Sequence, residues 1–382
     1  MAVDTGRAGA PRVAAVLSGC RVLVTARRRA DELAGALEQR GAEVTHVPTL
    51  STVVPGDDAE LLGRTKGLIA DPPDVVVVAS GLGLDLWLAA VRPAGLADAL
   101  LGTLGTARLV ARGPKARTAL LGAGLLPDWV AEADTTAEVA DFLVAEGLDG
   151  ARVAVVHHGG GDTGMEAVLT AAGSTVLPLE VYRWGPPDRP ALVHAAGRDL
   201  AEGCYDAVVF TSAPGALAWL DALTEVGATD AVRERVEAGE LLLAAVGAVT
   251  AEPLAFAGLI ARTPTRPRLG ALVRLVVSDL GDDRQALLTR HGRLRVRAGA
   301  ITLDHRPVPL PPSGLAVLRR LAATPGHVVT RDELLRVLPG DSTDPHTAEV
   351  AVARLREALR GATGDAGLVR TVIKRGYVLA AR

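Results

Sequence analysis

The stretch VAVVHHGGGDTGM gathers the residue types in this sequence that could do chemistry. His157 and His158 offer ring nitrogens to a metal or an anion, and the glycines after them leave backbone N–H groups open to a negative charge. Adjacent side chains at a strand end point to opposite faces, so one histidine alone could join Asp162, and we expect no metal. No Gly-Lys-Ser/Thr follows the glycines, which excludes a nucleotide P-loop. Two interpretations stay open: an anion-binding turn formed by His157, His158, Gly159 and Gly160, or a turn with one histidine packed inward.

The elements that position this turn alternate between strand and helix. Runs rich in Val and Leu each lead into a small or polar turn and then a helical pattern, and they are RVLVT (21–25), DVVVVA (74–79), RVAVVH (152–157), DAVVF (206–210) and LLLAAVG (241–247). Because apolar and polar residues do not alternate in these runs, we expect strands buried on both faces, as in parallel sheets covered by helices. The predicted fold class is therefore α/β.

An internal repeat predicts two lobes. VVVVASGLGLDLWLAAV (75–91) resembles AVVFTSAPGALAWLDAL (207–223), and RLVARGPKARTALLGAGLLPD (108–128) resembles LLAAVGAVTAEPLAFAGLIAR (242–262). Each copy reads as a strand, a turn, a helix, a second strand, a glycine turn and a second helix. We expect two similar doubly wound lobes with a cleft between them, where the turns at the carboxyl ends of the strands converge.

Residues 20 to 280 resemble the uroporphyrinogen-III synthase family. The matching features are VLVT before a helix that ends in LEQRGAEV, the connector LEVYRW, and the segments VVFTS and AAVGAVTAEPL. The resemblance implies a first lobe of residues 20–47 and 186–279, and a second lobe with its connectors of residues 48–185. It also implies that hydroxymethylbilane, a linear tetrapyrrole with eight carboxylates, is closed to a ring with loss of water and without metal or cofactor. Tyr182 is the matching candidate for the group that assists departure of the hydroxyl.

The resemblance further implies ligand-binding residues in the turns of both lobes. Beside the four residues of the histidine-glycine turn they are Thr25, Arg27, Ser80, Gly113, Thr211, Ser212, Gly247 and Thr250.

Several positions depart from the family pattern. The usual Arg-Pro after the first strand is Ala26-Arg27, a threonine after GPK is Ala116, the first Thr-Ser turn begins with Ala79, and two histidines replace an arginine. Each lost hydroxyl removes roughly 0.5 to 1.5 kcal/mol of hydrogen bonding to a ligand, which favours a binding-only descendant. Serine or threonine after a strand is as commonly an N-cap, and a connector tyrosine is commonly a packing residue, so these alternatives stay open.

The charge of the chain is divided unevenly. Residues 290–382 hold 16 Lys and Arg against 8 Asp and Glu, whereas the rest of the chain holds 25 against 36. An acidic body with a basic C-terminal region indicates nucleic acid as the partner of that region. Two distant cysteines and the lack of an apolar run near ~18 residues predict a cytoplasmic protein without disulfides or contact with a membrane.

The basic region, residues 292–382, resembles the OmpR/PhoB-type winged helix-turn-helix domain, with residues 280–291 as a linker. The motifs are VPLPPSGLAVLRRLAATPGHVVTRDELLRVL, HTAEVAVARLREAL and TVIKRGYVL. In the second motif Ala348, Val352, Leu355 and Leu359 recur at helical spacing and predict a buried stripe, so the opposite face can enter a major groove. The predicted DNA-binding residues on that helix and at the wing are His346, Thr347, Val350, Arg354, Arg356, Thr371, Lys374 and Arg375.

Two functions follow from these resemblances. The first is a transcription regulator of double-stranded DNA whose synthase-like body binds a tetrapyrrole or a small anion, or contacts RNA polymerase or a co-regulator, with a dimer on DNA as one arrangement. Actinobacterial proteins with this fusion regulate nitrate and nitrite assimilation, and only three lysines against many arginines suit a GC-rich genome. The second is a working uroporphyrinogen-III synthase that carries a DNA-binding domain.

Overall fold

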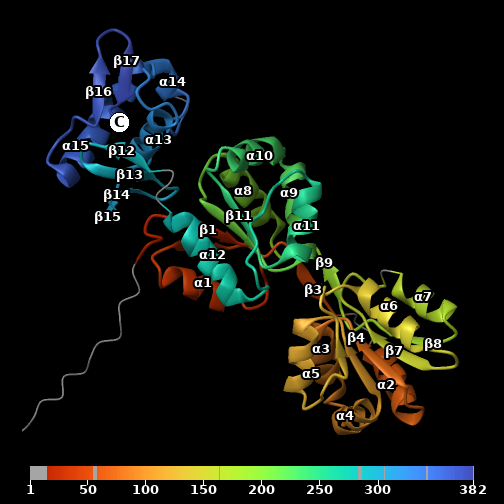
Figure 1. Cartoon of the computed structure of the whole chain (residues 1–382). Helices are drawn as coiled ribbons and strands as arrows, with labels where there is room; N and C mark the ends of the chain where they lie inside the picture. Colours follow the sequence, from red (N-terminus) through yellow and green to blue (C-terminus); the bar gives the residue numbers. More distant parts are fainter. Residues whose placement is uncertain are drawn as a thin grey trace, which may run out of the picture. The chain divides into compact units, whose positions relative to one another are not determined.

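Figure 1 shows the arrangement of the helices and strands in a computed structural model of the chain. The structure describes residues 15–54, 58–162, 164–282, 286–304, 306–340 and 343–381. The chain divides into two compact units, Met1–Thr49 with Arg189–Arg382 and Leu50–Asp188. The first unit contains one α/β lobe, here lobe 1, and the C-terminal domain, while the second unit is lobe 2. No helix in the described part of the chain is long and apolar enough to span a membrane.

Lobe 1 is built on a parallel sheet of four strands in the order β11-β10-β1-β2. The strands are β1 (Arg21–Val24), β2 (Glu43–His46), β10 (Ala207–Phe210) and β11 (Leu242–Ala245), and the helices are α1 (Ala30–Glu38), α8 (Pro190–Ala201), α9 (Ala213–Glu225), α10 (Thr229–Glu237), α11 (Ala248–Phe256) and α12 (Leu269–Gly281). Leu23 of β1 packs with α8 to α11, whereas Val22 and Val24 pack with α1 and α12. Burial on both faces explains the unbroken apolar runs and confirms these predicted strands.

Lobe 2 repeats this architecture with a parallel sheet in the order β6-β5-β4-β7-β8. Its strands are β4 (Val75–Val78), β5 (Arg108–Ala111), β6 (Trp129–Val130), β7 (Arg152–Val156) and β8 (Thr175–Leu179), and its helices are α2 (Asp58–Ala70), α3 (Gly81–Val91), α4 (Ala97–Thr106), α5 (Pro114–Gly122), α6 (Thr136–Glu146) and α7 (Met165–Ala171). Val76 and Val78 of β4 face α2 to α5, whereas Val75 and Val77 face α6 and α7. Two connector strands, β3 (Ser51–Val53) and β9 (Arg183–Gly185), pair antiparallel.

The C-terminal domain is a winged helix-turn-helix domain that opens with an antiparallel sheet, β12-β13-β14-β15. Its elements are β12 (Leu287–Thr289), β13 (Gly292–Val296), β14 (Ile301–Leu303), β15 (Arg306–Val308), α13 (Pro312–Ala322), α14 (Arg331–Leu335), α15 (Pro345–Thr363), β16 (Val369–Val372) and β17 (Gly376–Leu379). Strand β12 and the end of α12 both lie in the segment expected to be a linker, of which residues 283–285 lie outside the described residues. The sheet of this domain therefore begins before residue 292, because Leu287 pairs with Leu294.

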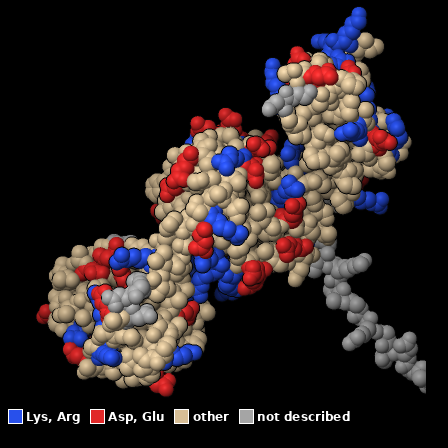
Figure 2. Space-filling model, turned by 180° about the vertical axis from the view of Figure 1, so that it is seen from behind, with Lys and Arg blue, Asp and Glu red and all other residues tan. Residues whose placement is uncertain are grey.

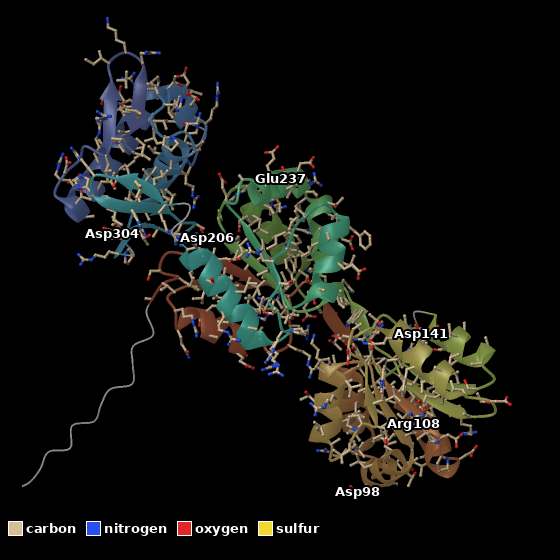
Figure 3. All side chains as sticks on the ribbon, in the orientation of Figure 1. Asp98, Arg108, Asp141, Asp206, Glu237 and Asp304 are labelled. Carbon is tan, nitrogen blue, oxygen red and sulfur yellow. The ribbon has the colours of Figure 1, made fainter. Side chains whose placement is uncertain are left out.

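Lobe 1 and the C-terminal domain share a buried contact at Asp206, the residue before β10 (Figure 3). One Asp206 carboxylate oxygen accepts hydrogen bonds from the backbone N–H groups of Arg21, at 2.8 Å, and Ala298, at 3.0 Å. Ala298 belongs to the turn between β13 and β14, and burial is the main cause that raises the pKa of Asp206 above its usual range. Beside it, Arg319 of α13 donates to the carbonyl oxygen of Ala298 at 2.7 Å, and Gly299 N–H donates to Gly19 at 3.0 Å.

Asp206 has a counterpart at the equivalent position of the internal repeat. Its counterpart in lobe 2 is Asp74, which precedes β4 and accepts a hydrogen bond from the N–H of Arg152 at 2.8 Å. In both lobes the carboxylate therefore joins the starts of two neighbouring parallel strands. Asp206 alone of the pair also accepts an N–H from the C-terminal domain, so lobe 1 uses a repeated strand-capping residue to dock that domain.

Candidate functional site

The ligand-binding residues predicted in lobe 1 follow the carboxyl ends of β1, β10 and β11, which lie at one edge of the sheet because these strands are parallel. Thr25 is buried, and its hydroxyl donates to the Val209 carbonyl at 3.1 Å. Ser212 is the N-cap of α9, where its hydroxyl accepts the N–H of Gly215 at 3.3 Å. Gly247 is the N-cap residue of α11, and as a glycine it forms no side-chain hydrogen bond to the helix. The structure thus brings these turns together, and it commits two of the hydroxyls to the fold itself.

Three further predicted residues accompany this edge. Arg27 is exposed just after β1, Thr211 is half-buried between β10 and Ser212, and Thr250 is buried in the first turn of α11. Arg27 therefore carries positive charge at the edge where an anionic ligand was expected to bind.

The carboxyl edge of the sheet in lobe 2 holds Ser80, Gly113 and Tyr182. Ser80 caps α3 by accepting the N–H of Gly83 at 3.1 Å, and its hydroxyl lies 2.8 Å from the Tyr182 hydroxyl. Both side chains are buried, Tyr182 with 3% of its surface exposed. A tyrosine in this position is already paired and enclosed, which fits the packing interpretation better than a group that assists hydroxyl departure. Gly113 is the N-cap residue of α5, and a Cβ at this position would collide with the Asp134 carboxylate.

The two histidines lie on opposite sides of the turn after β7, as the alternation of a strand predicts. His157 is buried, whereas His158 stacks on Trp184 with ring centroids 5.3 Å apart and accepts the N–H of Gly160 at its Nδ1 atom. Burial and the charge of Arg112 lower the pKa of His158 to about 4, so this ring is neutral at neutral pH. The family pattern had suggested that the two histidines replace an arginine. A neutral His158 does not supply the positive charge of that arginine. Gly159 packs where a Cβ would lie 2.6 Å from the Tyr182 ring.

Arg112, a cation that was not predicted from the sequence, lies beside this turn. Arg112 follows β5, and its buried Nε atom lies 3.5 Å from Asp134 Oδ1, an ion pair in which Nε forms no hydrogen bond with any described residue. Its place directly before Gly113, in ARGPK, was the available signal. Arg112 supplies the permanent positive charge that an anion requires, whereas the N–H groups of Gly160 and Gly161 already donate to His158.

Sequence reasoning also missed an acid near His157. The sequence had indicated Asp162 as the only carboxylate near the histidines. In the structure Glu166 is a second one, and its Oε1 atom lies 2.6 Å from His157 Nε2. Helix α7 starts at Met165 and turns the chain back toward β7, so a residue nine positions away in sequence becomes a neighbour.

The second candidate site is the exposed face of α15. Its buried side is formed by Ala348, Ala351, Val352, Leu355 and Leu359, which confirms the predicted stripe. The Asp344 side chain caps the helix by accepting the N–H of His346 at 2.9 Å.

On the opposite side of α15 His346 and Arg354 are exposed, while Thr347 and Val350 are half-buried. Arg331 of α14 pairs with Glu349 at 2.9 Å and so ties the two helices of the helix-turn-helix motif. The free face can enter a major groove and bring Arg354 to a base edge.

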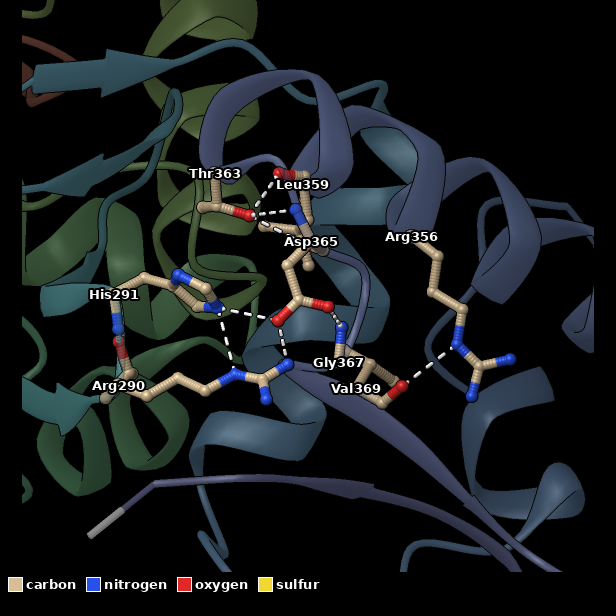
Figure 4. Close-up of polar contacts among 9 residues, drawn as sticks. Arg290, His291, Arg356, Leu359, Thr363, Asp365, Gly367 and Val369 are labelled. Atoms are coloured by element: carbon tan, nitrogen blue, oxygen red, sulfur yellow. Dashed lines mark hydrogen bonds and ion pairs between the residues drawn. The ribbon is translucent and has the colours of Figure 1, made fainter.

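The wing is fastened to α15 by Arg356. Its Nε atom donates to the Val369 carbonyl at 2.9 Å, as Figure 4 shows, and its Nη2 atom donates to the Thr371 hydroxyl at 2.8 Å. Its guanidinium also lies 5.6 Å from the centre of the Tyr377 ring. Arg356 and Thr371 are thus partly committed to positioning the wing, whereas Lys374 and Arg375 at its tip are exposed. Figure 2 shows basic side chains projecting from this domain.

The exposed Lys374 gives a first testable expectation. Replacing Lys374 with alanine should remove one phosphate contact and lower the slope of log K against log salt by about 0.9. Fluorescence anisotropy with duplex DNA over a salt series measures the slope. Lys66→Ala, an exposed lysine of lobe 2, is the control and should leave the slope unchanged. An unchanged slope for Lys374→Ala would remove the wing tip from the interface.

Comparisons with known proteins agree with this geometry. The family model described as uroporphyrinogen-III synthase HemD matches residues 31–274, and the one described as transcriptional regulatory protein, C terminal, matches residues 305–379.

Individual relatives each match one of these two parts of the chain. The uncharacterized protein YjjA of Bacillus subtilis strain 168 is 28% identical over 258 residues, which are 67% of this chain and 94% of that protein. A mutant uroporphyrinogen III synthase of Thermus thermophilus is similar with a TM-score of 0.55 and 26% identity, over 68% of this chain and 98% of that one. The RstA DNA-binding domain of Klebsiella pneumoniae, solved in complex with the RstA box, is 28% identical over 23% of this chain and 90% of its own, with a TM-score of 0.21. The chain belongs to the uroporphyrinogen-III synthase HemD family and carries a transcription-regulator DNA-binding domain after its synthase-like body.

Proposed function

We propose that this protein is a transcription regulator that binds double-stranded DNA through α15 and the wing, and that its synthase-like body senses an anionic ligand. The observation that carries the proposal is the double role of β1 and β10. At their carboxyl ends these strands lead to Thr25 and Thr211. At their amino ends lie Arg21 and Asp206, and the Asp206 carboxylate accepts N–H groups from both Arg21 and Ala298 of the C-terminal domain. A change at the ligand edge of lobe 1 thus has a direct covalent and hydrogen-bonded route to the DNA-binding domain.

The charge and the backbone of the predicted binding turns indicate the class of ligand. Helix α11 begins after Gly247, which has no side chain to occupy the helix N-terminus, and the positive end of the helix dipole attracts an anion there. Arg112 in lobe 2 and the exposed Arg27 in lobe 1 add permanent positive charge. A polycarboxylate such as a tetrapyrrole, or a smaller anion, is the chemistry that such groups bind.

Arg112 provides the test of this ligand class. Arg112→Ala should weaken binding of uroporphyrin III, a stable tetrapyrrole with eight carboxylates, by roughly tenfold, about 1.4 kcal/mol. Tryptophan fluorescence or calorimetry measures the affinity. Arg117→Ala, an exposed arginine of α5, is the matched control. Equal affinity of both variants and the parent would mean that Arg112 does not contact the ligand.

The alternative function, a working synthase, is disfavoured by the buried pair of Tyr182 and Ser80. Incubation with hydroxymethylbilane, followed by separation of the uroporphyrinogen isomers, distinguishes the two functions. A regulator without synthase activity yields the isomer of the protein-free control, in which the last ring is not inverted, whereas rapid formation of isomer III establishes the enzyme.

The proposal extends to the process that the regulator controls. We propose control of nitrate and nitrite assimilation, because actinobacterial regulators that share this fusion act there and sirohaem, the cofactor of nitrite reductase, derives from uroporphyrinogen III. The full chain should bind DNA from upstream of its own gene and of nitrite reductase genes more tightly than unrelated DNA of equal length. Equal affinity for all three DNAs would contradict a specific regulator.

A further inference from the structure

Three potential metal ligands meet after β7 in lobe 2. His157, Asp162 and Glu166 each offer one ligand atom, and these atoms all lie within 4.8 Å of one another. We propose that these three side chains bind one divalent transition-metal ion, with Zn²⁺ as the ion of first choice. The site goes beyond the proposed regulatory function and revises the expectation of no metal, which rested on a single nearby carboxylate.

The state of His157 is the observation that points to an ion. Its side chain is only 3% exposed, and its Nε2 atom has no hydrogen-bond partner among the described residues, although Glu166 Oε1 lies 2.6 Å away. Lobe 1 offers a comparison, because His194 Nε2 and Glu225 Oε2 lie at a similar 2.7 Å and do form a hydrogen bond. The His157 and Glu166 atoms are close without the ring N–H pointing at the oxygen. A buried polar atom without a partner is costly, and an ion bound between the two atoms, after a small shift that separates them, would satisfy both.

The backbone holds the three groups in place. The N–H of His157 donates to the Leu179 carbonyl of β8 at 3.0 Å, so the imidazole is fixed at the sheet edge. Asp162 Oδ1 accepts the N–H of Glu166 at 3.2 Å, which ties the turn to α7. Gly161, with φ of +72°, supplies the left-handed backbone that returns the chain toward the strand.

The charge at this position suits a divalent cation. Asp162 and Glu166 line a cavity of about 320 Å³ together with Glu60 and Glu180, which are paired with Arg64 and Arg183 respectively.

Among the described residues no arginine or lysine forms an ion pair with Asp162 or Glu166, since Arg64 and Arg183 of the same cavity pair with Glu60 and Glu180. One ring nitrogen and two carboxylates form a donor set that Zn²⁺ accepts, and the fourth tetrahedral position would remain open to water or to an anion from the cavity. His158 does not join them, because its Nδ1 accepts the Gly160 N–H.

Calorimetry with ZnCl₂ on the full chain, after removal of metal with a chelator, tests the proposal. We expect one ion per chain, confirmed by native mass spectrometry, and a rise in the thermal midpoint on addition of Zn²⁺. Glu166→Gln and Asp162→Asn alter partly exposed side chains and should each lower the affinity at least tenfold. Glu225→Gln, which changes the hydrogen-bonded pair in lobe 1, should leave the affinity unchanged.

A second cluster, Asp199, Glu202 and Cys204, provides the competing location. Cys204→Ser should therefore retain the ion. Loss of zinc from Cys204→Ser, equal affinity of Glu166→Gln and the parent, or the absence of any stoichiometric binding would each overturn the assignment. Substitution with Co²⁺ supplies a readout of the ligand type, because nitrogen and oxygen ligands lack the intense charge-transfer band of a thiolate. A strong thiolate band would place the ion at Cys204 and not at His157.

Discussion

Asp206→Ala is expected to lower the free energy of unfolding by about 2 to 5 kcal/mol, because it leaves the N–H groups of Arg21 and Ala298 without an acceptor at a buried contact. The matched change Asp74→Ala removes one exposed hydrogen bond and should cost about 0.5 to 1.5 kcal/mol. Urea unfolding of the full chain measures both. Hydrogen exchange at Ala298 reports the docking itself, and equal exchange in the parent and Asp206→Ala would show that the carboxylate does not hold the C-terminal domain.

The dependence on pH separates the charge of Asp206 from its hydrogen bonds. Burial raises the pKa of Asp206 in the folded state, so the stability linked to its bound proton is fully present below the unfolded pKa and is lost as pH rises through the folded pKa. Asp206→Asn keeps one oxygen for both N–H donors and does not ionise. We therefore expect Asp206→Asn to gain stability relative to the parent as pH increases from acid to neutral, measured by urea unfolding across that range. A constant difference between the two proteins would contradict a raised pKa.

Docking through Asp206 also bears on regulation. If β1 and β10 transmit the state of the ligand edge, Asp206→Ala should retain ligand affinity while DNA affinity no longer responds to ligand. Anisotropy measurements with and without uroporphyrin III give this comparison. A response that persists in Asp206→Ala would mean that coupling follows another route.

Arg354→Ala is expected to weaken specific DNA binding by about 1 to 3 kcal/mol, because Arg354 is exposed on the free face of α15 and can form two hydrogen bonds to a guanine. Discrimination between specific and unrelated DNA should fall with it. Arg360→Ala, an exposed arginine in the last turn of the same helix, should change both affinities equally. Anisotropy titrations at one fixed salt concentration measure these differences. A uniform loss of affinity for all DNAs in Arg354→Ala would assign this arginine to a phosphate.

Much of the fold was predictable from local patterns. The buried strands, the stripe on α15 and the two repeated lobes follow from the spacing of apolar residues, because one face of a helix or both faces of a strand must be buried. Ser80 and Ser212 lie at helix starts, and the structure uses them as N-caps, an alternative that the sequence had left open. The ligand-binding roles of these turns stay predictions.

Other features depended on contacts between distant segments. Asp206 and Ala298 are 92 residues apart in the sequence, and no periodic pattern links them. The strand β12 was hidden in a segment whose polar and acidic start indicated a linker, and its pairing with β13 made it part of the sheet. Likewise, nothing in the sequence indicates an unusual pKa for His158. Its burial and the nearby charge of Arg112, which lower this pKa, arise only in the folded structure.

The sequence by itself determined the α/β class and the two lobes, because hydrophobic periodicity is a local property. Its resemblance to known families indicated the winged-helix domain and predicted the ligand-binding residues in the turns. The tertiary structure alone decided which of those side chains are already used by the fold, that the pKa of His158 is lowered, and which carboxylate docks the DNA-binding domain. Burial and desolvation arise from segments that pack together across the whole chain, and they set the charge and the free hydrogen-bonding groups of each site.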